Sequence, residues 1–352
     1  MTRRKPGTAL AALAASVALA GCGALSAPRP PVPAAIEVAG GHNGFKADSG
    51  PSSQPGAGSR VTAGSGTLRA RSSLLRPSGK YLGVEADGAP ESIDPVQTVA
   101  TSVGRNPNLI GEYVGWDDPF DATGAANAAH DGALYYGVWE PYHVTVRSVA
   151  DGGSDAYITK FARSVASFGQ PVALSFGHEM NGYWYPWGTK AAGAMPADFV
   201  AAWRHIHDLF ARAGAGNVIW VWNPNDISPV PDVPLEPYWP GDTYVDWVGI
   251  TGYFAMNGPQ TFDALYEPTM TQVRQFTSKP FIIAETAVET GKSELSEMKS
   301  LVEGVESHSD VLGFIWFNYV KANVDWTLTD RPKARATFAN LIAGMPLATP
   351  GT

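Results

Sequence analysis

Two carboxyl groups stand at the ends of otherwise apolar segments. Glu179 follows "PVALSFGH" (171–178), and Glu285 follows "PFIIA" (280–284). The end of a buried strand is an unfavourable place for an ionised carboxylate unless it is paired or takes part in chemistry. Two carboxyls that face one another across a cleft can act as acid/base and nucleophile in glycoside cleavage. The alternative at this point is that each glutamate pairs with an arginine or caps a loop.

Other acidic residues compete for these roles. Glu140 lies in "WEPYH", where the proline that follows predicts a strand-terminating turn. We therefore interpret Glu140 as a substrate contact or a structural residue. Glu85 and Glu112 are weaker candidates, and Asp325 in "DWT" is expected to fix a loop.

The segment "SFGHEMNGYWYPWG" (175–188) places His178, Glu179 and Asn181 directly before four aromatic rings. A loop that follows a polar group is usually polar, so these rings indicate a planar or apolar ligand. Trp184, Trp187 and the more distant Trp316 are predicted to stack against a sugar ring. Trp203 and Trp220 are predicted to belong to the core.

Several other kinds of site are not supported. The His178-Glu179 pair lacks a second histidine four positions after the first, so it is not a zincin helix. His130 and His143 stand alone, and no metal or cofactor is predicted. There is no Gly-x-Ser-x-Gly turn, and the one cysteine is Cys22, so serine and cysteine nucleophiles are unsupported.

The elements that would position these residues are eight short apolar segments, bounded mostly by Gly, Pro, Asn or Asp. Such near-continuous runs are typical of strands buried on both faces. They are "KYLGVEA" (80–86), "NLIGEYVGW" (108–116), "GALYYGVWE" (132–140), "PVALSFGHE" (171–179), "NVIWVWN" (217–223), "YVDWVGITGYF" (244–254), "PFIIAETA" (280–287) and "DVLGFIWFN" (310–318).

Amphipathic helical patterns lie between several strands, at 155–168, 196–214, 261–277 and 292–307. The alternation favours a parallel sheet, and eight repeats favour a closed (β/α)8 TIM barrel. An open doubly wound sheet is the alternative, but no strand is followed by a Gly-x-Gly-x-x-Gly turn. The active site of a barrel lies at the carboxyl ends of its strands. Those ends carry Glu85, Trp116, Trp139, Glu140, His178, Glu179, Trp222, Asn223, Tyr253, Glu285 and Trp316.

The amino-terminal segment predicts export. Basic residues at 3–5 precede a short apolar run that closes with Leu-Ala-Gly-Cys, and Cys22 is the expected lipidation site because this ending resembles a bacterial lipobox. We expect residues 1–21 to be a lipoprotein signal peptide. The protein is then extracytoplasmic, anchored to the cell membrane through Cys22 or released.

Residues 22–78 are rich in Pro, Gly, Ser and Ala and are predicted to be a disordered linker. Residues 79–352 form the predicted catalytic domain. Removal of residues 1–21 would take away three basic and no acidic residues and change the net charge from −8 to −11. This acidic balance argues against nucleic acid as a partner. We expect a monomer whose partner is a polysaccharide.

At "HEMNGYWYPWG" and "FIIAETA" the chain resembles glycoside hydrolase family 26, a retaining family of the large clan of (β/α)8 glycosidases. The resemblance runs from about Tyr81 to Ile342. It implies that Glu179 is the acid/base and Glu285 the nucleophile. It further implies that His178 reaches the sugar, that Tyr253 binds the nucleophile, and that Trp184 and Trp316 wall the sugar subsite. The full set of candidate substrate-binding residues is His178, Trp184, Tyr253, Trp316, Trp187, Trp139, Glu140, His143 and Asn223.

The family contains endo-β-1,4-mannanases, mixed-linkage β-1,3-1,4-glucanases and β-1,3-xylanases. Mannanases with this motif often continue "WFWWG", whereas this chain has "WYPWG" (184–188). The resemblance implies an endo-acting mannanase first, with the other two activities as alternatives. An alternative of another class is an exported lipoprotein that binds sugar without cleaving it. Such proteins usually have two lobes, and the two opposed carboxylates favour the enzyme.

Overall fold

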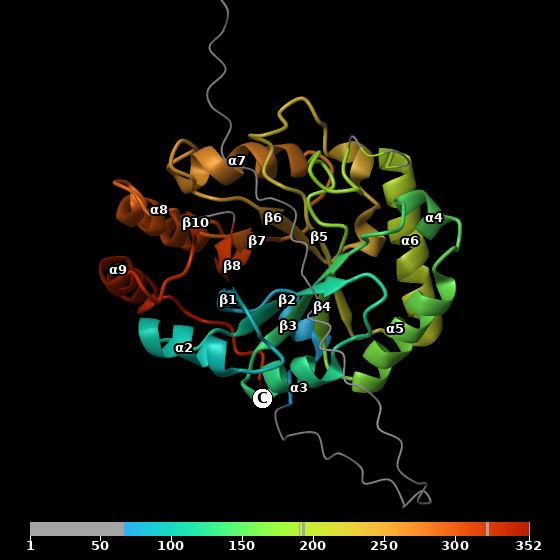
Figure 1. Ribbon diagram of the computed structural model, residues 1–352, viewed down its shortest axis with the longest axis horizontal. Coiled ribbons are helices and arrows are strands. Elements are labelled where there is room, and N and C mark those ends of the chain that lie inside the picture. The colour runs from blue at the N-terminus through green and yellow to red at the C-terminus, as the bar shows by residue number, and fades with distance from the viewer. Residues whose placement is uncertain (1–66, 190, 192–193, 322–323, 352) are drawn as a thin grey trace, which may run out of the picture.

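The computed structural model describes residues 67–189, 191, 194–321 and 324–351. Eight parallel strands pair in chain order and close into a barrel, with β8 hydrogen-bonded to β1 (Figure 1). The strands are β1 (Tyr81–Ala86), β2 (Leu109–Gly115), β3 (Leu134–Glu140), β4 (Val172–Phe176), β5 (Val218–Trp222), β6 (Trp247–Thr251), β7 (Phe281–Thr286) and β8 (Val311–Asn318). The eight predicted strands and the predicted barrel are confirmed.

Helices surround the barrel in the part of the chain that the structure describes (Figure 1). They are α1 (Arg71–Leu74), α2 (Asp94–Val103), α3 (Ala122–His130), α4 (Val146–Ala150), α5 (Asp155–Phe168), α6 (Pro196–Ala213), α7 (Phe262–Val273), α8 (Glu294–Ser307) and α9 (Pro332–Ile342), with 3-10 turns η1 (Glu236–Tyr238) and η2 (Asp242–Tyr244). The four predicted helical segments correspond to α5, α6, α7 and α8. None of these described helices is long and apolar enough to cross a membrane.

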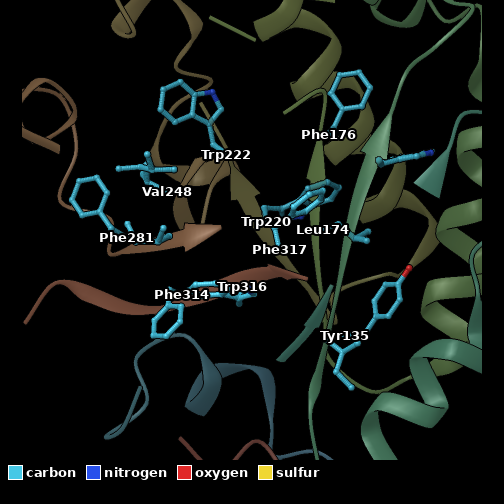
Figure 2. Packing of buried hydrophobic residues seen from close by; sticks show 14 of the residues in the cluster. Tyr135, Leu174, Phe176, Trp220, Trp222, Val248, Phe281, Phe314, Trp316 and Phe317 are labelled. Atoms are coloured by element: carbon cyan, nitrogen blue, oxygen red, sulfur yellow. The ribbon is translucent and has the colours of Figure 1, made fainter. Parts of the chain in front are cut away.

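The apolar strands bury both faces, so the core has two layers. Alternate side chains point into the barrel or out toward the helices, because successive residues of a strand face opposite sides. Tyr136, Ile219 and Ile315 belong to the inner layer. Tyr135, Trp222 and Phe314 belong to the outer layer, part of which Figure 2 shows. This two-sided burial explains why the strand segments read as continuous apolar runs.

Residues 67–78 close the amino-terminal end of the barrel. Leu68 and Leu74 are buried, and Leu68 forms a bridge with Gly351 near the other end of the chain. Arg71 donates to the backbone oxygen of Val218 at 2.5 Å and forms an ion pair with Asp246. These residues therefore belong to the barrel, and the predicted linker boundary at residue 78 lies too late. They were missed because three leucines spaced among Ser and Arg form no recognisable periodic segment.

The carboxyl-terminal end of the barrel carries longer loops. A small antiparallel pair, β9 (Val320–Lys321) and β10 (Val324–Asp325), follows β8 on this side. The predicted signal peptide, Cys22 and the linker up to residue 66 lie outside the described residues. Their assignments remain predictions.

Candidate active site

Glu179 sits in a turn of unusual backbone geometry at the end of β4. Its φ is +54°, in the left-handed region, and the nearby Gly177 has a φ of +56°. A non-glycine residue in this region costs about 1–3 kcal/mol and persists only when its surroundings hold it. The amide of Glu179 donates to the backbone oxygen of Asn223 at 2.6 Å. The end of β5 therefore holds the turn that presents the Glu179 carboxyl.

Asn181 provides a second link between the same two loops. Its side-chain amide donates to the backbone oxygen of Asn225 at 2.9 Å, and its side-chain oxygen accepts from the backbone amide of Asn225 at 2.9 Å. Asn181 is completely buried. The amide in the His-Glu-Met-Asn motif thus fixes the loop that carries Glu179.

Two of the rings that follow the motif hold His178. The Tyr185 hydroxyl lies 3.1 Å from Nε2 of His178, and the indole nitrogen of Trp187 donates to the His178 backbone oxygen at 2.7 Å. The Tyr185 and Trp187 rings stack with centroids 4.4 Å apart. Trp187 is buried, so its predicted contact with a sugar gives way to a role in packing beneath His178.

The Glu179 carboxyl is buried and accepts a hydrogen bond from the indole nitrogen of Trp184. Burial, and next the negative charge of Glu285, raise the pKa of Glu179 to about 8. The Trp184 hydrogen bond opposes this rise without cancelling it. Glu179 is therefore protonated at neutral pH, as a proton donor must be. Trp184 itself remains partly exposed beside this carboxyl.

Glu285 lies at the end of β7 in a different environment. One oxygen accepts from the Tyr253 hydroxyl and the other from the Tyr113 hydroxyl. Burial raises the pKa of Glu285, whereas Lys321 and the two tyrosine hydrogen bonds favour its ionised form. Both oxygens thus have hydrogen-bond donors suited to a negative charge. The site contains one carboxyl held protonated and another equipped to stay ionised.

His178 is neutral in this site. Burial, with a smaller effect of the Lys321 charge, lowers its pKa to about 3. Its Nδ1 atom has no hydrogen-bond partner among the residues that the structure describes. The ring therefore adds no positive charge beside Glu179.

Aromatic rings of later elements complete the wall around Glu285. The Phe317 ring meets those of Tyr253 and Tyr113 edge-on, at centroid distances of 5.8 and 6.4 Å. Trp326 packs against Tyr253 at 4.9 Å. The Lys321 ammonium lies over Phe317, 5.6 Å from the ring centroid. This wall holds Tyr253 in place to donate to Glu285.

Some predicted binding residues lie elsewhere. Trp139 is buried and stacks on Phe161 of α5 at 4.5 Å. Trp316 packs against Phe338 of α9 at 5.1 Å, and its indole nitrogen donates to the Trp326 backbone oxygen. Both rings therefore point toward the helices, and we correct their assignment from sugar binding to packing. At β8 it is the next residue, Phe317, that faces the site.

Asn223 and His143 also do not join the two carboxyls. The Asn223 side chain is buried inside the barrel, 3.4 Å from the hydroxyls of both Tyr136 and Thr251. Only its backbone oxygen reaches Glu179. His143 is exposed in the loop after β3, in a left-handed conformation with a φ of +67°. The structure gives it a ring contact with Tyr142.

Glu140 lies close enough to Glu285 and Glu179 for their charges to act on it. It is buried, and its Oε1 atom has no hydrogen-bond partner within the described part of the chain. Burial raises its pKa to about 8, opposed by Lys321 and supported by the charges of Glu285 and Glu179. It is thus a further carboxyl that is neutral at pH 7.

The burial of Glu140 predicts a pH-dependent stability. Because its folded-state pKa lies above its usual value of 4.5, Glu140 contributes stability in full below about pH 4.5, and this is lost as pH rises through about 8. Glu140→Gln stays neutral at every pH and does not lose this stability. The free energy of unfolding of the variant minus that of wild type is therefore expected to be larger at pH 9 than at pH 5. Each pKa unit corresponds to about 1.4 kcal/mol.

Urea unfolding of both proteins at pH 5 and pH 9 checks this expectation. Glu303→Gln, on an exposed position of α8, controls for the general effect of removing one acidic residue. If the difference in free energy of unfolding between Glu140→Gln and wild type is the same at both pH values, Glu140 is not held in its neutral form.

Sequence reasoning missed four residues of the site, namely Tyr113, Phe317, Lys321 and Trp326. Tyr113 stands two residues after Gly111 on β2. Because alternate residues of a strand face the same side, the pattern of β2 could have placed Tyr113 on the inward face. Lys321 is the cation that acts on several carboxyls of the site, and it lies only three residues beyond the last predicted strand. Nothing in its immediate sequence marks it.

The arrangement can protonate one atom of a ligand and attack another. No group of three or more His, Cys, Asp or Glu side chains suited to a metal ion is present in residues 67–351, apart from the few positions not described. The buried carboxyls Glu179 and Glu285 can themselves supply acid/base and nucleophilic chemistry.

Known proteins of similar sequence and fold were found for this chain. Residues 154–300 match the family model of glycosyl hydrolase family 26. Endoglucanase H of Acetivibrio thermocellus is 29% identical over 267 residues, which are 72% of this chain and 29% of that protein. The beta-1,3-xylanase TXYA of a Vibrio species is 29% identical over 56% of this chain and 43% of that protein.

A mannan endo-1,4-beta-mannosidase of Bacillus subtilis is 28% identical over 32% of this chain and 34% of that protein. The chain spans less than half the length of these relatives. Among solved structures, a Bacillus subtilis mannanase has a TM-score of 0.59 at 16% identity and covers 80% of this chain and 90% of its own. That likeness concerns the fold alone. Residues 154–300 thus resemble glycosyl hydrolase family 26, and the similar glycan-cleaving relatives agree with that resemblance.

Proposed function

We propose that this chain is a retaining endo-β-glycanase that hydrolyses a β-linked polysaccharide by double displacement. The observation that carries the proposal is the contrast between two buried carboxyls at the mouth of one barrel. Glu179 is held protonated, and Glu285 receives two hydroxyl donors. Environments that separate the pKa values of two neighbouring carboxyls are typical of a glycosidase acid/base and nucleophile.

In the first step Glu179 gives its proton to the glycosidic oxygen while a Glu285 oxygen attacks the anomeric carbon. The bond from that carbon to the leaving sugar breaks, and a covalent glycosyl-enzyme forms. In the second step Glu179, now ionised, takes a proton from water as the water oxygen attacks the same carbon and frees Glu285. Two displacements retain the configuration of the anomeric carbon.

The neighbouring side chains support these steps. The Tyr253 donor stabilises the negative charge of Glu285 before attack. Trp184 presents a partly exposed ring next to Glu179, which suits the apolar C–H face of a pyranose. The His178 ring is buried against Tyr185, so it supports the site by packing rather than by direct contact with a sugar hydroxyl.

For the substrate we propose a β-1,4-mannan, in agreement with the mannan-cleaving relatives of the chain. A mixed-linkage β-glucan is the second candidate, because the relative that matches 72% of this chain is named an endoglucanase. A β-1,3-xylan is the third, from the two xylanase relatives. Export and a lipid anchor at Cys22 stay part of the proposal, on the sequence alone.

Reducing-end release from mannan, mixed-linkage β-glucan and β-1,3-xylan tests this function, using the chain from residue 67 onward. We expect one polymer to be cut internally, with a rapid fall in viscosity for each new reducing end. Release without that fall would indicate cleavage from chain ends. Binding to a polymer without any release would favour the non-catalytic sugar-binding lipoprotein.

A further inference from the structure

A fourth buried carboxyl group, Glu85, shares the Tyr113 hydroxyl with Glu285. Glu85 is the penultimate residue of β1 and has no solvent-exposed surface. Its Oε2 atom lies 3.2 Å from the Tyr113 hydroxyl oxygen, and the same hydroxyl contacts Oε2 of Glu285. The carboxyls of Glu85 on β1 and Glu285 on β7 therefore both contact the hydroxyl of Tyr113.

The number of protons at this phenol restricts the charges. The Tyr113 hydroxyl has one hydrogen and can donate it to only one of the two carboxyls. If both carboxyls were ionised, one would face a phenol oxygen without a hydrogen between them, which is repulsive. A protonated Glu85 removes the conflict, because its own O–H then donates to the Tyr113 oxygen and leaves the Tyr113 hydrogen for Glu285.

The surroundings of Glu85 favour the protonated form. Its Oε1 atom has no hydrogen-bond partner among the described residues. Burial, and next the charge of Glu285, raise its pKa well above 4.5, and Glu140 on β3 acts in the same direction. The Tyr113 hydrogen bond and Lys321 on β9 oppose the rise.

The backbone of β2 fixes the Glu85 side chain in this position. Glu85 pairs with Gly111 in the β1–β2 register. A Cβ atom placed on Gly111 would lie 2.6 Å from Oε1 of Glu85, closer than any real contact. The side chain thus occupies space that only a glycine leaves open, two residues before Tyr113 on the same face of β2. This packing leaves the carboxyl little freedom to turn away from Tyr113.

We infer that Glu85 is a positioning residue that works as a neutral carboxylic acid: it donates its proton to the Tyr113 oxygen and so directs the Tyr113 hydroxyl to Glu285. A phenol that accepts one hydrogen bond becomes a stronger donor of its own. Glu85 thereby helps to keep Glu285 ionised and oriented without touching the substrate. This inference deepens the proposed function and rests on it for its kinetic consequences.

The kinetic test compares Glu85→Gln with Glu85→Leu. Gln is neutral and retains an N–H donor for Tyr113, whereas Leu has similar bulk and no donor. We expect Glu85→Leu to lower kcat roughly five- to tenfold, the effect of one hydrogen bond of typical net strength. Its acidic limb of kcat/KM is expected to move to higher pH, because Glu285 loses support for its charge. Glu85→Gln is expected to restore the position of that limb.

Glu112→Leu is the matched control. Glu112 lies next in sequence to Gly111 and accepts from Tyr135 at 2.8 Å, so it forms a similar pair away from Glu285. This control should leave the acidic limb in place. A Glu85→Gln limb displaced to lower pH would mean that Glu85 is an ionised neighbour of Glu285, and a Glu85→Leu profile like that of wild type would mean that it positions nothing. Either outcome overturns the inference.

A double variant keeps the test valid if Glu85→Leu folds poorly. In a Tyr113→Phe background the shared hydroxyl is gone, so replacing Glu85 with Gln or Leu should give the same pH profile. Different profiles in that background would overturn the role of Tyr113 as the link.

Infrared difference spectra decide the protonation state without any turnover. Wild type minus Glu85→Gln at pH 7 should show the C=O band of a protonated carboxyl. A carboxylate band in its place overturns the inference. Failure of the proposed function would instead appear as the absence of cleavage of all three polymers, with this infrared band present.

Discussion

Glu285→Gln is expected to lower kcat/KM on the cleaved polymer by about 10⁴-fold or more, the scale seen when a nucleophile is removed from other hydrolases. The carboxamide has nearly the shape of the carboxyl and keeps an oxygen that accepts from Tyr113 or Tyr253. It is a very weak nucleophile and forms no stable glycosyl ester. Binding of oligosaccharide should therefore survive while turnover is lost. Reducing-end assays and calorimetric titration with an oligosaccharide measure the two separately.

Azide gives this prediction a stereochemical control. With Glu285→Ala and an activated aryl β-glycoside, azide can occupy the space of the missing carboxyl and attack the anomeric carbon directly, so the product should be the α-glycosyl azide. Residual activity of Glu285→Gln within tenfold of wild type, on a folded protein, would sink the nucleophile assignment. A melting curve like that of wild type establishes the folding.

Glu179→Ala should separate substrates by their leaving groups. On polysaccharide the glycosidic oxygen needs a proton, so a loss of about 10²–10⁴-fold in kcat is expected. On an aryl glycoside whose phenolate leaves without protonation, the first step should be nearly preserved. Azide should then attack the glycosyl-enzyme and give the β-glycosyl azide, the opposite anomer to that from Glu285→Ala.

The pH profile supplies an independent check of the Glu179 role. Wild type requires a protonated Glu179, so activity on polysaccharide should fall as pH rises through about 8. Glu179→Ala should show no such basic limb on the activated aryl glycoside, since the group that titrates is absent. Equal damage on both substrates, with the basic limb unchanged, would argue against Glu179 as the acid.

The fold could be predicted because burial on both faces leaves a plain signal. Segments such as 280–287 and 310–318 are almost entirely apolar, and each became a strand within a few residues of the predicted bounds. The same property hid the orientation of side chains. In β8, Phe314, Trp316 and Phe317 are all apolar and buried, so their sequence does not reveal which of them faces the mouth.

The irregular register between β7 and β8 adds to this ambiguity. A shift in pairing changes which residue stands at the mouth, and no local pattern announces it. Trp316 was therefore predicted in the position that Phe317 occupies. The two carboxyls were easier, because a lone Glu at the end of an apolar strand has few alternative explanations.

Glu85 is a residue whose role could not be predicted from the sequence. Its strand end marked it as a weak candidate, but its effect depends on Tyr113 in the next strand and Glu285 on β7. Contacts across a closing barrel join residues 172 positions apart, and a single sequence contains no measure of such proximity. The same holds for Arg71 and Asp246 at the opposite end.

The closed end of the barrel determines how the protein can be immobilised or fused to another module. Leu68 and Gly351 bridge one another there, and Lys80 pairs with Leu347 beside them. Both ends of the described chain therefore emerge together, on the side away from Glu179 and Glu285. A bead, a chip or a fused module attached at either end would leave the mouth facing outward, free to meet a polymer too large to diffuse.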